Sequence, residues 1–138
     1  KFYGVHDDDY SKTVIGGAIV RAKVDTTHPM AYGYRRSELS VFRNGTTFLE
    51  PSDNPYETPL RYADEPLISG YLGDERARQL AGSAAVIATR VGAGSVIRLA
   101  DNPNFRGFWF GTNRLYFNAL FFGQVLDRTP VPDTEARL

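Results

Sequence analysis

The sequence contains no cysteine, one methionine and two histidines. Without cysteine the chain has no disulfide, no thiolate metal ligand and no cysteine nucleophile. No apolar run approaches the roughly 20 residues that a membrane-spanning helix needs. Neither sign of charge is in excess, because 16 Lys and Arg residues balance 16 Asp and Glu residues. We therefore expect neither nucleic acid nor an anionic membrane as a partner, since both usually require a basic surface.

The remaining composition is that of one globular domain. The chain has 138 residues, 42% hydrophobic and 23% charged, which is enough for a core and too apolar for a disordered tail. It begins with Lys1 and its only methionine is Met30. We therefore expect a piece of a longer protein, without a signal peptide at this end. The composition along the chain predicts a linker from an upstream domain over residues 1–14, a single domain over 15–127 and a flexible tail over 128–138.

Three segments have the pattern of β-strands and hairpins. Val20, Ala22 and Val24 alternate with charged residues, which predicts a half-buried strand over 18–25. Asn44-Gly45 stands between two β-branched and aromatic runs, which predicts a hairpin over 39–49. Asn44-Gly45-Thr46 also fits a glycosylation acceptor, although the turn alone explains these residues. A glycine-bearing turn at 92–94 predicts a second hairpin over 84–100.

The other segments predict one irregular crossing and two helices. Residues 50–66 contain four prolines, which exclude a long helix there. Residues 74–81 have the pattern of a short helix that Gly82 ends. Residues 112–126 form the best helical pattern, and it is apolar on almost every side. Such a helix is either buried or docked on a partner.

The segment 101–113 is the richest in functional groups. It precedes the long predicted helix and combines one carboxylate, one guanidinium, several amides and clustered aromatic rings, and our candidate ligand or structural residues are Asp101, Asn104, Arg106, Trp109 and Asn113. As a binding site, Arg106 and the helix N-terminus would hold an anion, and the rings would stack on a sugar. As structure, Asp101 would pair with Arg106 or cap a turn while the rings fill the edge of the core. We favour the structural interpretation.

A metal site is the second candidate. His6 and Asp9 stand three residues apart, and His28 would be the third ligand. Imidazole and carboxylate groups are suitable ligands for zinc or iron. The alternative is that the acidic run at 7–9 is solvated and that His28 hydrogen-bonds a strand end before Pro29. We favour this alternative. The serines and glycine-rich turns match neither a nucleophile elbow nor a phosphate loop.

A succession of motifs resembles the C-terminal region of large bacterial proteins of the zinc carboxypeptidase family. The resemblance extends over roughly 15–123, and its segments are Ile15–Arg21, His28–Tyr34, Val41–Arg43, Ala81–Val86, Val91–Gly94, Asp101–Gly107, Gly111–Leu115 and Asn118–Ala119. In those proteins a peptidase domain is followed by a domain that resembles class I glutamine amidotransferases. The resemblance implies an α/β fold, a reduced flavodoxin-like sandwich rich in β-hairpins with a buried C-terminal helix.

The catalytic residues of both related classes are missing from this sequence. The peptidases bind zinc with a His-x-x-Glu pair. In this sequence the residue three positions after His6 is Asp9, and the residue three positions after His28 is Ala31. The amidotransferases need a cysteine. The resemblance therefore implies a non-catalytic accessory domain without a cofactor of its own. It also implies an exported, periplasmic or secreted parent, with zinc in the upstream peptidase domain as its partner.

Three functional hypotheses remain at this point. The first is that accessory domain, which supports docking, folding or assembly, including assembly into a homo-oligomer. The second is a carbohydrate or cell-wall binding module, suggested by an aromatic content of 13% with tyrosines in polar stretches, namely Tyr3, Tyr10, Tyr32, Tyr34, Tyr56, Tyr62 and Tyr71. The third is a small metal enzyme that uses His6, Asp9 and His28. We favour the first.

Overall fold

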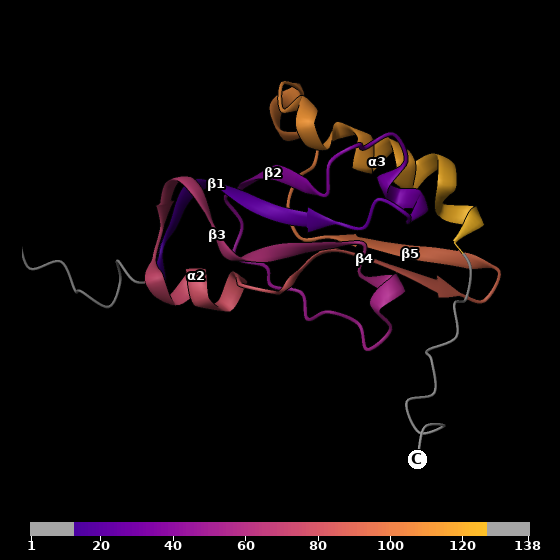
Figure 1. Cartoon of the computed structure of the whole chain (residues 1–138), viewed down its shortest axis with the longest axis horizontal. Coiled ribbons are helices and arrows are strands. Elements are labelled where there is room, and N and C mark those ends of the chain that lie inside the picture. The colour runs from indigo at the N-terminus through magenta and orange to yellow at the C-terminus, as the bar shows by residue number, and fades with distance from the viewer. Residues whose placement is uncertain (1–12, 127–138) are drawn as a thin grey trace, which may run out of the picture.

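The computed structural model describes residues 13–126, which form a curled antiparallel sheet with one long helix against it (Figure 1). The strand order is β2-β1-β3-β4-β5. The strands are β1 (Ile15–Val24), β2 (Glu38–Arg43), β3 (Leu60–Leu72), β4 (Ala84–Val91) and β5 (Gly94–Leu99). The helices are α2 (Asp74–Leu80) and α3 (Phe110–Phe122), with short 3-10 helices η1 (Pro29–Ala31), η2 (Pro55–Glu57), η3 (Phe105–Gly107) and η4 (Gly123–Val125).

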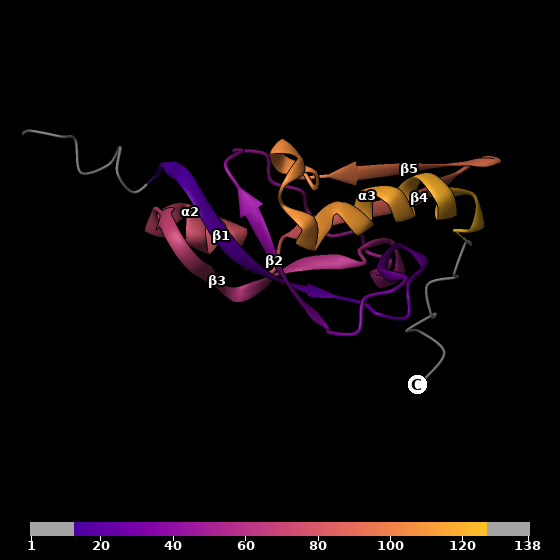
Figure 2. The ribbon, with the colours of Figure 1, turned by 90° about the horizontal axis from the view of Figure 1, so that it is seen from above.

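The expectation of a flavodoxin-like α/β sandwich is wrong. That fold needs parallel strands, each joined to the next by a helical crossover, with helices on both faces. Here every neighbouring pair of strands in the sheet is antiparallel. The connections explain the difference, since α2 has only seven residues and α3 follows the last described strand. The sheet instead curls into a half-barrel, and α3 lies along one side of it (Figure 2).

Strand β1 confirms the alternation found in the sequence. Val20 and Ala22 are fully buried and Val24 nearly so, whereas Arg21 and Lys23 are exposed. The strand pairs with β2 on one side and β3 on the other, which makes it the centre of the core. The buried side chains from β1, β2, β3, β4, η1 and α3 meet in one cluster.

The irregular crossing expected over 50–66 ends earlier than the prolines suggested. Strand β3 begins at Leu60 and continues through Pro66 to Leu72. It accommodates proline because its pairing with β1 is interrupted there: Ala22 pairs with Tyr62 and Val20 with Leu67. The residues between them bulge out of the ladder, so the missing N–H of Pro66 costs no hydrogen bond of the sheet.

One of the two predicted hairpins is confirmed and the other is wrong. Val91 pairs with Gly94 across the turn between β4 and β5, as expected for residues 84–100. In contrast, β2 pairs with β1 and not with the residues that follow Asn44-Gly45. Arg43, directly before that dipeptide, donates from Nη2 to the carbonyl of Thr47 and holds the segment in an irregular loop.

Both predicted helices are present, with small shifts. Helix α2 lies over 74–80, and Gly82 adopts a positive φ two residues after it. Helix α3 begins two residues early, at Phe110, and the chain continues from it into η4. Its buried residues are Thr112, Leu115 and Asn118, at the spacing of a single face. The C-terminal helix is therefore buried on one face only, not all round.

Candidate functional site

The structure divides the five candidate residues of segment 101–113 between separate environments. Asp101 lies in the interior, where its Oδ1 is 3.0 Å from Nη1 of Arg43, with side chains 6% and 0% exposed respectively. Tyr62 completes the group, since its hydroxyl donates to Oδ2 of Asp101 and accepts from Nη1 of Arg43 at 3.1 Å. We call Arg43, Tyr62 and Asp101 the buried triad. Asp101 does not pair with Arg106, contrary to one of our expectations.

The electrostatics of the buried triad indicate a structural role. Burial raises the pKa of the Asp101 carboxyl, and the Arg43 guanidinium opposes that shift. Burial also raises the pKa of Tyr62, as does the neighbouring Asp101 charge. The phenol therefore stays protonated and donates to Asp101. The triad joins β2, β3 and the segment before α3. Arg43 Nη2 donates outside it, to the carbonyl of Thr47, and Arg43 Nε is buried without a hydrogen-bond partner among the described residues.

Arg43 was missed by sequence reasoning although a signal was present. It stands two residues after Val41 on the same strand, and residues at that spacing point to the same face of a sheet. Val41 pairs with Val20 in the core, so the alternation along the strand places the Arg43 side chain in the interior as well. Its guanidinium carbon lies 4.8 Å from the centre of the Phe48 ring, a cation–π contact.

Asn104, Arg106 and Asn113 organise the turn before α3. With its amide nitrogen turned toward them, Asn113 donates to the carbonyls of Trp109 and Pro103 at 3.1 Å and to Oδ1 of Asn104 at 2.8 Å. Arg106 is exposed, has a φ of 50° and lies over the Phe105 ring at 5.2 Å. The amides of Asn104 and Asn113 and the guanidinium of Arg106 do not point into one common cavity. The structural interpretation that we favoured for this segment fits these contacts.

The proposed metal set can be examined only at His28, since His6 and Asp9 lie outside the described residues. His28 is buried, and its Nδ1 accepts a hydrogen bond from the backbone N–H of Met30 at 3.1 Å. The residue thereby caps η1, whereas the alternative interpretation expected it to hydrogen-bond a strand end. Burial lowers its pKa to about 4, an effect that the Asp25 charge partly offsets. Within residues 13–126, no three His, Asp or Glu side chains gather as metal ligands.

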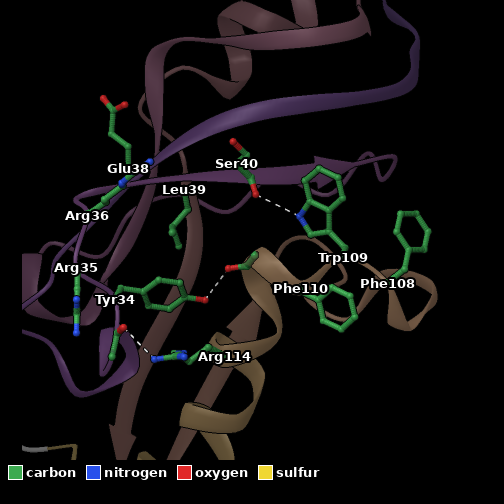
Figure 3. Close-up of a pocket in the computed structure, with 12 residues that line it drawn as sticks. Tyr34, Arg35, Arg36, Glu38, Leu39, Ser40, Phe108, Trp109, Phe110 and Arg114 are labelled. Atoms are coloured by element: carbon green, nitrogen blue, oxygen red, sulfur yellow. Dashed lines mark hydrogen bonds between the residues drawn. The ribbon is translucent and has the colours of Figure 1, made fainter.

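A pocket of about 720 Å³ lies between the start of β2 and the start of α3 (Figure 3). We call it the arginine pocket, and its lining residues are Gly33, Tyr34, Arg35, Arg36, Glu38, Leu39, Ser40, Phe108, Trp109, Phe110, Gly111 and Arg114. Three guanidinium groups thus share the lining with one carboxylate. The volume falls in the range of ordinary ligand sites. Of these residues, Trp109 was a candidate of segment 101–113 and Tyr34 was among the tyrosines that suggested a carbohydrate module.

Three hydrogen bonds between distant segments fix the walls of the arginine pocket (Figure 3). Tyr34 donates from its hydroxyl to the carbonyl of Gly111 at 2.9 Å, and Trp109 donates from Nε1 to the carbonyl of Ser40 at 3.2 Å. Arg114 donates from Nη1 to the carbonyl of Gly33 at 2.9 Å. Burial raises the pKa of Tyr34 to about 12, so its hydroxyl remains a donor at neutral pH.

Gly33 is required for this arrangement. Its φ is +84°, and a Cβ built on it would lie 2.0 Å from Nη1 of Arg114. Only glycine allows the backbone to turn there and the arginine to approach. No sequence signal indicated that residues 33–36 would meet α3, because the meeting depends on how the β1–β2 connection packs.

The outer face of α3 carries a row of exposed apolar side chains. Phe110, Phe117, Leu120 and Phe121 are 77%, 49%, 62% and 76% exposed, and we call them the aromatic face of α3. Their spacing of seven, three and one residues places them on one side of the helix, opposite Leu115 and Asn118. Phe110 also lines the arginine pocket, so the two features are continuous.

Comparison with family models, curated proteins and solved structures finds no match to this chain. Among the helices of residues 13–126, none combines the length and hydropathy of a membrane-spanning helix.

Proposed function

We propose that this chain is a non-catalytic accessory domain that docks on a partner domain through the aromatic face of α3. The exposure of Phe110, Phe117, Leu120 and Phe121 on one side of the helix carries this proposal. Contiguous exposed apolar surface is unusual in a monomer and typically marks an interaction site. From the sequence, this apolar helix was expected to be either buried or docked on a partner, and its exposed apolar side favours docking for that side.

The size of the aromatic face favours a partner joined to this domain by the chain. Complete burial of one Phe or Leu side chain is worth about 1.5–3 kcal/mol. The four side chains are already partly covered, so burying their remaining surface gives at most about 4–8 kcal/mol, which only reaches the low end of what free association costs, about 4–15 kcal/mol. A covalent link removes most of that cost by raising the effective concentration of the partner. A tethered domain therefore gains more from this surface than a free partner would.

We further propose that the partner is an upstream peptidase domain of a zinc metallocarboxypeptidase-like protein. The support is the succession of motifs over 15–123, above all Asp101–Gly107 and the helix that follows. In this proposal zinc belongs to the peptidase domain, and the parent protein is exported. The amidotransferase-like fold that the resemblance implied is not part of it.

The carbohydrate-binding alternative has less support. Stacking on sugars needs aromatic rings gathered on one exposed platform, and the tyrosines within residues 13–126 do not form one. Tyr62 is buried, Tyr34 is hydrogen-bonded at the edge of the arginine pocket, and Tyr56 of η2 packs against His28. Tyr32 follows η1, and Tyr71 lies in β3. Tyr3 and Tyr10 lie outside the described residues.

A capture experiment tests the proposed function. The reading frame upstream of this chain is sequenced. Its product and this chain are expressed separately, mixed at high concentration and cross-linked, because the untethered domains should associate weakly. We expect a His-x-x-Glu zinc set upstream and a cross-linked product of the two. Leu120→Asp with Phe121→Asp should abolish that product, while Leu67→Asp, at an apolar residue of β3 that is 45% exposed, should not.

Three outcomes would overturn the proposal. One is an upstream product without a zinc set, and another is equal capture by both variants. The third is zinc-dependent peptide hydrolysis by this chain alone. A dimer of this chain that the Leu120 and Phe121 substitutions dissociate would replace the upstream domain with a second copy as the occupant of the face.

A further inference from the structure

We propose that the arginine pocket binds the carboxylates of an acidic peptide segment in which aspartate or glutamate stands beside an aromatic or aliphatic residue. This inference rests on the proposed docking function and names the chemistry of the partner segment that approaches the N-terminal end of α3.

The positive half of the pocket has unused charge. Arg35 and Arg36 are exposed and form no hydrogen bond or ion pair with any described residue. Arg114 uses Nη1 to hold the carbonyl of Gly33, and the rest of its guanidinium remains free for another acceptor. Glu38, the one acidic lining residue, lies 3.8 Å from Nε of Arg21, a neighbour outside the lining. The pocket therefore presents a net positive charge, although the whole chain is neutral.

The other half of the pocket is aromatic. Phe108 and Phe110 are exposed. Trp109, between them in the sequence, donates from its indole Nε1 to the carbonyl of Ser40 (Figure 3). Trp109 is also the N-cap residue of α3 and makes no side-chain cap bond, so the first amides of the helix add partial positive charge beside the rings. Guanidinium groups opposite apolar rings suit a carboxylate adjacent to an apolar group.

The walls are already in place before a ligand binds. The bonds from Tyr34, Trp109 and Arg114 join the 33–40 segment to the start of α3. Binding then needs to order only the side chains of Arg35 and Arg36. A preformed site loses less entropy on binding than a mobile one.

Two observations favour a peptide over a free anion. Phe110 belongs both to the pocket and to the aromatic face of α3, so a polypeptide that covers this face passes over the pocket. Strand β2, which supplies Glu38, Leu39 and Ser40, is an edge strand of the sheet, so an extended segment can lie beside it wherever Trp109 does not already hold the carbonyl of Ser40. A free anion would use neither feature.

The test measures the fluorescence anisotropy of a labelled peptide, acetyl-Phe-Asp-Asp-Asp-Tyr-amide, titrated with the full chain at low salt. We expect saturable binding that the double variant Arg35→Ala with Arg36→Ala weakens at least tenfold. Arg78→Ala with Arg98→Ala removes the same charge from exposed positions outside the pocket and should change the Kd less than twofold. The same peptide with Asn at every Asp should not bind.

Several results would overturn the inference. They are no binding of the acidic peptide, equal loss in both double variants, or equal binding of the Asn peptide. Displacement of the peptide by inorganic phosphate or acetate at the peptide's own Kd would show that a free anion is enough. The failure of this inference is separable from that of the proposed function: if Leu120→Asp abolishes capture while the peptide does not bind, only the inference fails. If the peptide binds while capture is insensitive to Leu120, the docking function fails.

Discussion

Arg43 and Asp101 form an ion pair in the interior of this domain, with Nη1 3.0 Å from Oδ1. The pair joins the edge strand β2 to the segment that leads into α3, and Tyr62 of β3 closes the group. Because both charges are almost fully buried, each depends on the other for compensation. The pair is one of the links that hold the segment before α3, and with it the start of the helix, against the sheet.

Asp101→Ala should destabilise the fold strongly, because it leaves the Arg43 guanidinium buried without its carboxylate. We expect a loss of about 3–5 kcal/mol in the free energy of unfolding, measured by urea denaturation. Asp64→Ala removes the partner of an exposed ion pair with Lys23 and should change the free energy of unfolding far less. A loss at Asp101 no larger than that at Asp64 would contradict the structural role of the triad.

His28 should make the domain sensitive to mild acid. Its pKa is lowered by burial to about 4, against a usual value of 6.5, so the unfolded state binds more protons between these pH values. The free energy of unfolding should therefore fall by about 2 kcal/mol as the pH is lowered from 6.5 to 4. Denaturation midpoints across this range give the measurement.

His28→Asn separates titration from capping. Asparagine retains an acceptor for the N–H of Met30 but does not titrate, so the variant should fold and lose the His28 part of the acid sensitivity. His28→Ala removes the cap as well and should cost about 1 kcal/mol more. An unchanged pH profile in His28→Asn would show that other groups set the acid response.

Substitutions on the buried face of α3 should destabilise the fold much more than substitutions on its exposed face. Leu115 is buried against the sheet, and Leu115→Ala should cost about 2–5 kcal/mol. Leu120→Ser, on the exposed face, should change the free energy of unfolding by less than about 0.5 kcal/mol. Thermal denaturation of both variants makes the comparison, and an equal cost would mean that Leu120 packs inside the domain.

Replacing Gly70 should lower the free energy of unfolding more than replacing a glycine in an open turn. Its φ is +90°, and a Cβ there would lie 2.5 Å from the carbonyl oxygen of Gly17 on the neighbouring strand. Gly70→Ala should cost about 1–3 kcal/mol or more, because strain and a backbone clash add. Gly92→Ala is the control, since its φ is also positive but a Cβ there meets open space. Equal losses would show that the clash is relieved by movement of β1.

Local patterns predicted the elements whose neighbours are close in the sequence. The alternation around Val20 gave β1, the turn at Gly92-Ala93 gave the β4–β5 hairpin, and apolar spacing gave α3. Asn44-Gly45 misled because contacts made by the preceding residue hold this loop: Arg43 points inward, pairs with Asp101, and donates to the carbonyl of Thr47. Pro66 misled because a bulge in β3 removes the usual penalty for proline in a strand.

The candidate site was harder to predict than the fold. Trp109 was identified, but its pocket partners Arg35 and Arg36 carry no motif of their own. They line one pocket with the start of α3, and the two segments are held together by bonds such as that from Arg114 to Gly33, 81 residues apart in the sequence. A contact of that range depends on the packed fold, so spacing in the sequence could not reveal it.

The central claim is that the aromatic face of α3 docks on the partner domain. Isothermal titration of the upstream domain into this chain at several temperatures tests it most directly. We predict a negative heat-capacity change, because apolar surface is buried, and a Kd that Leu120→Asp with Phe121→Asp raises at least tenfold. The Leu67→Asp control should change the Kd less than twofold. A heat-capacity change near zero, or a Kd that both variants leave unchanged, would contradict the account.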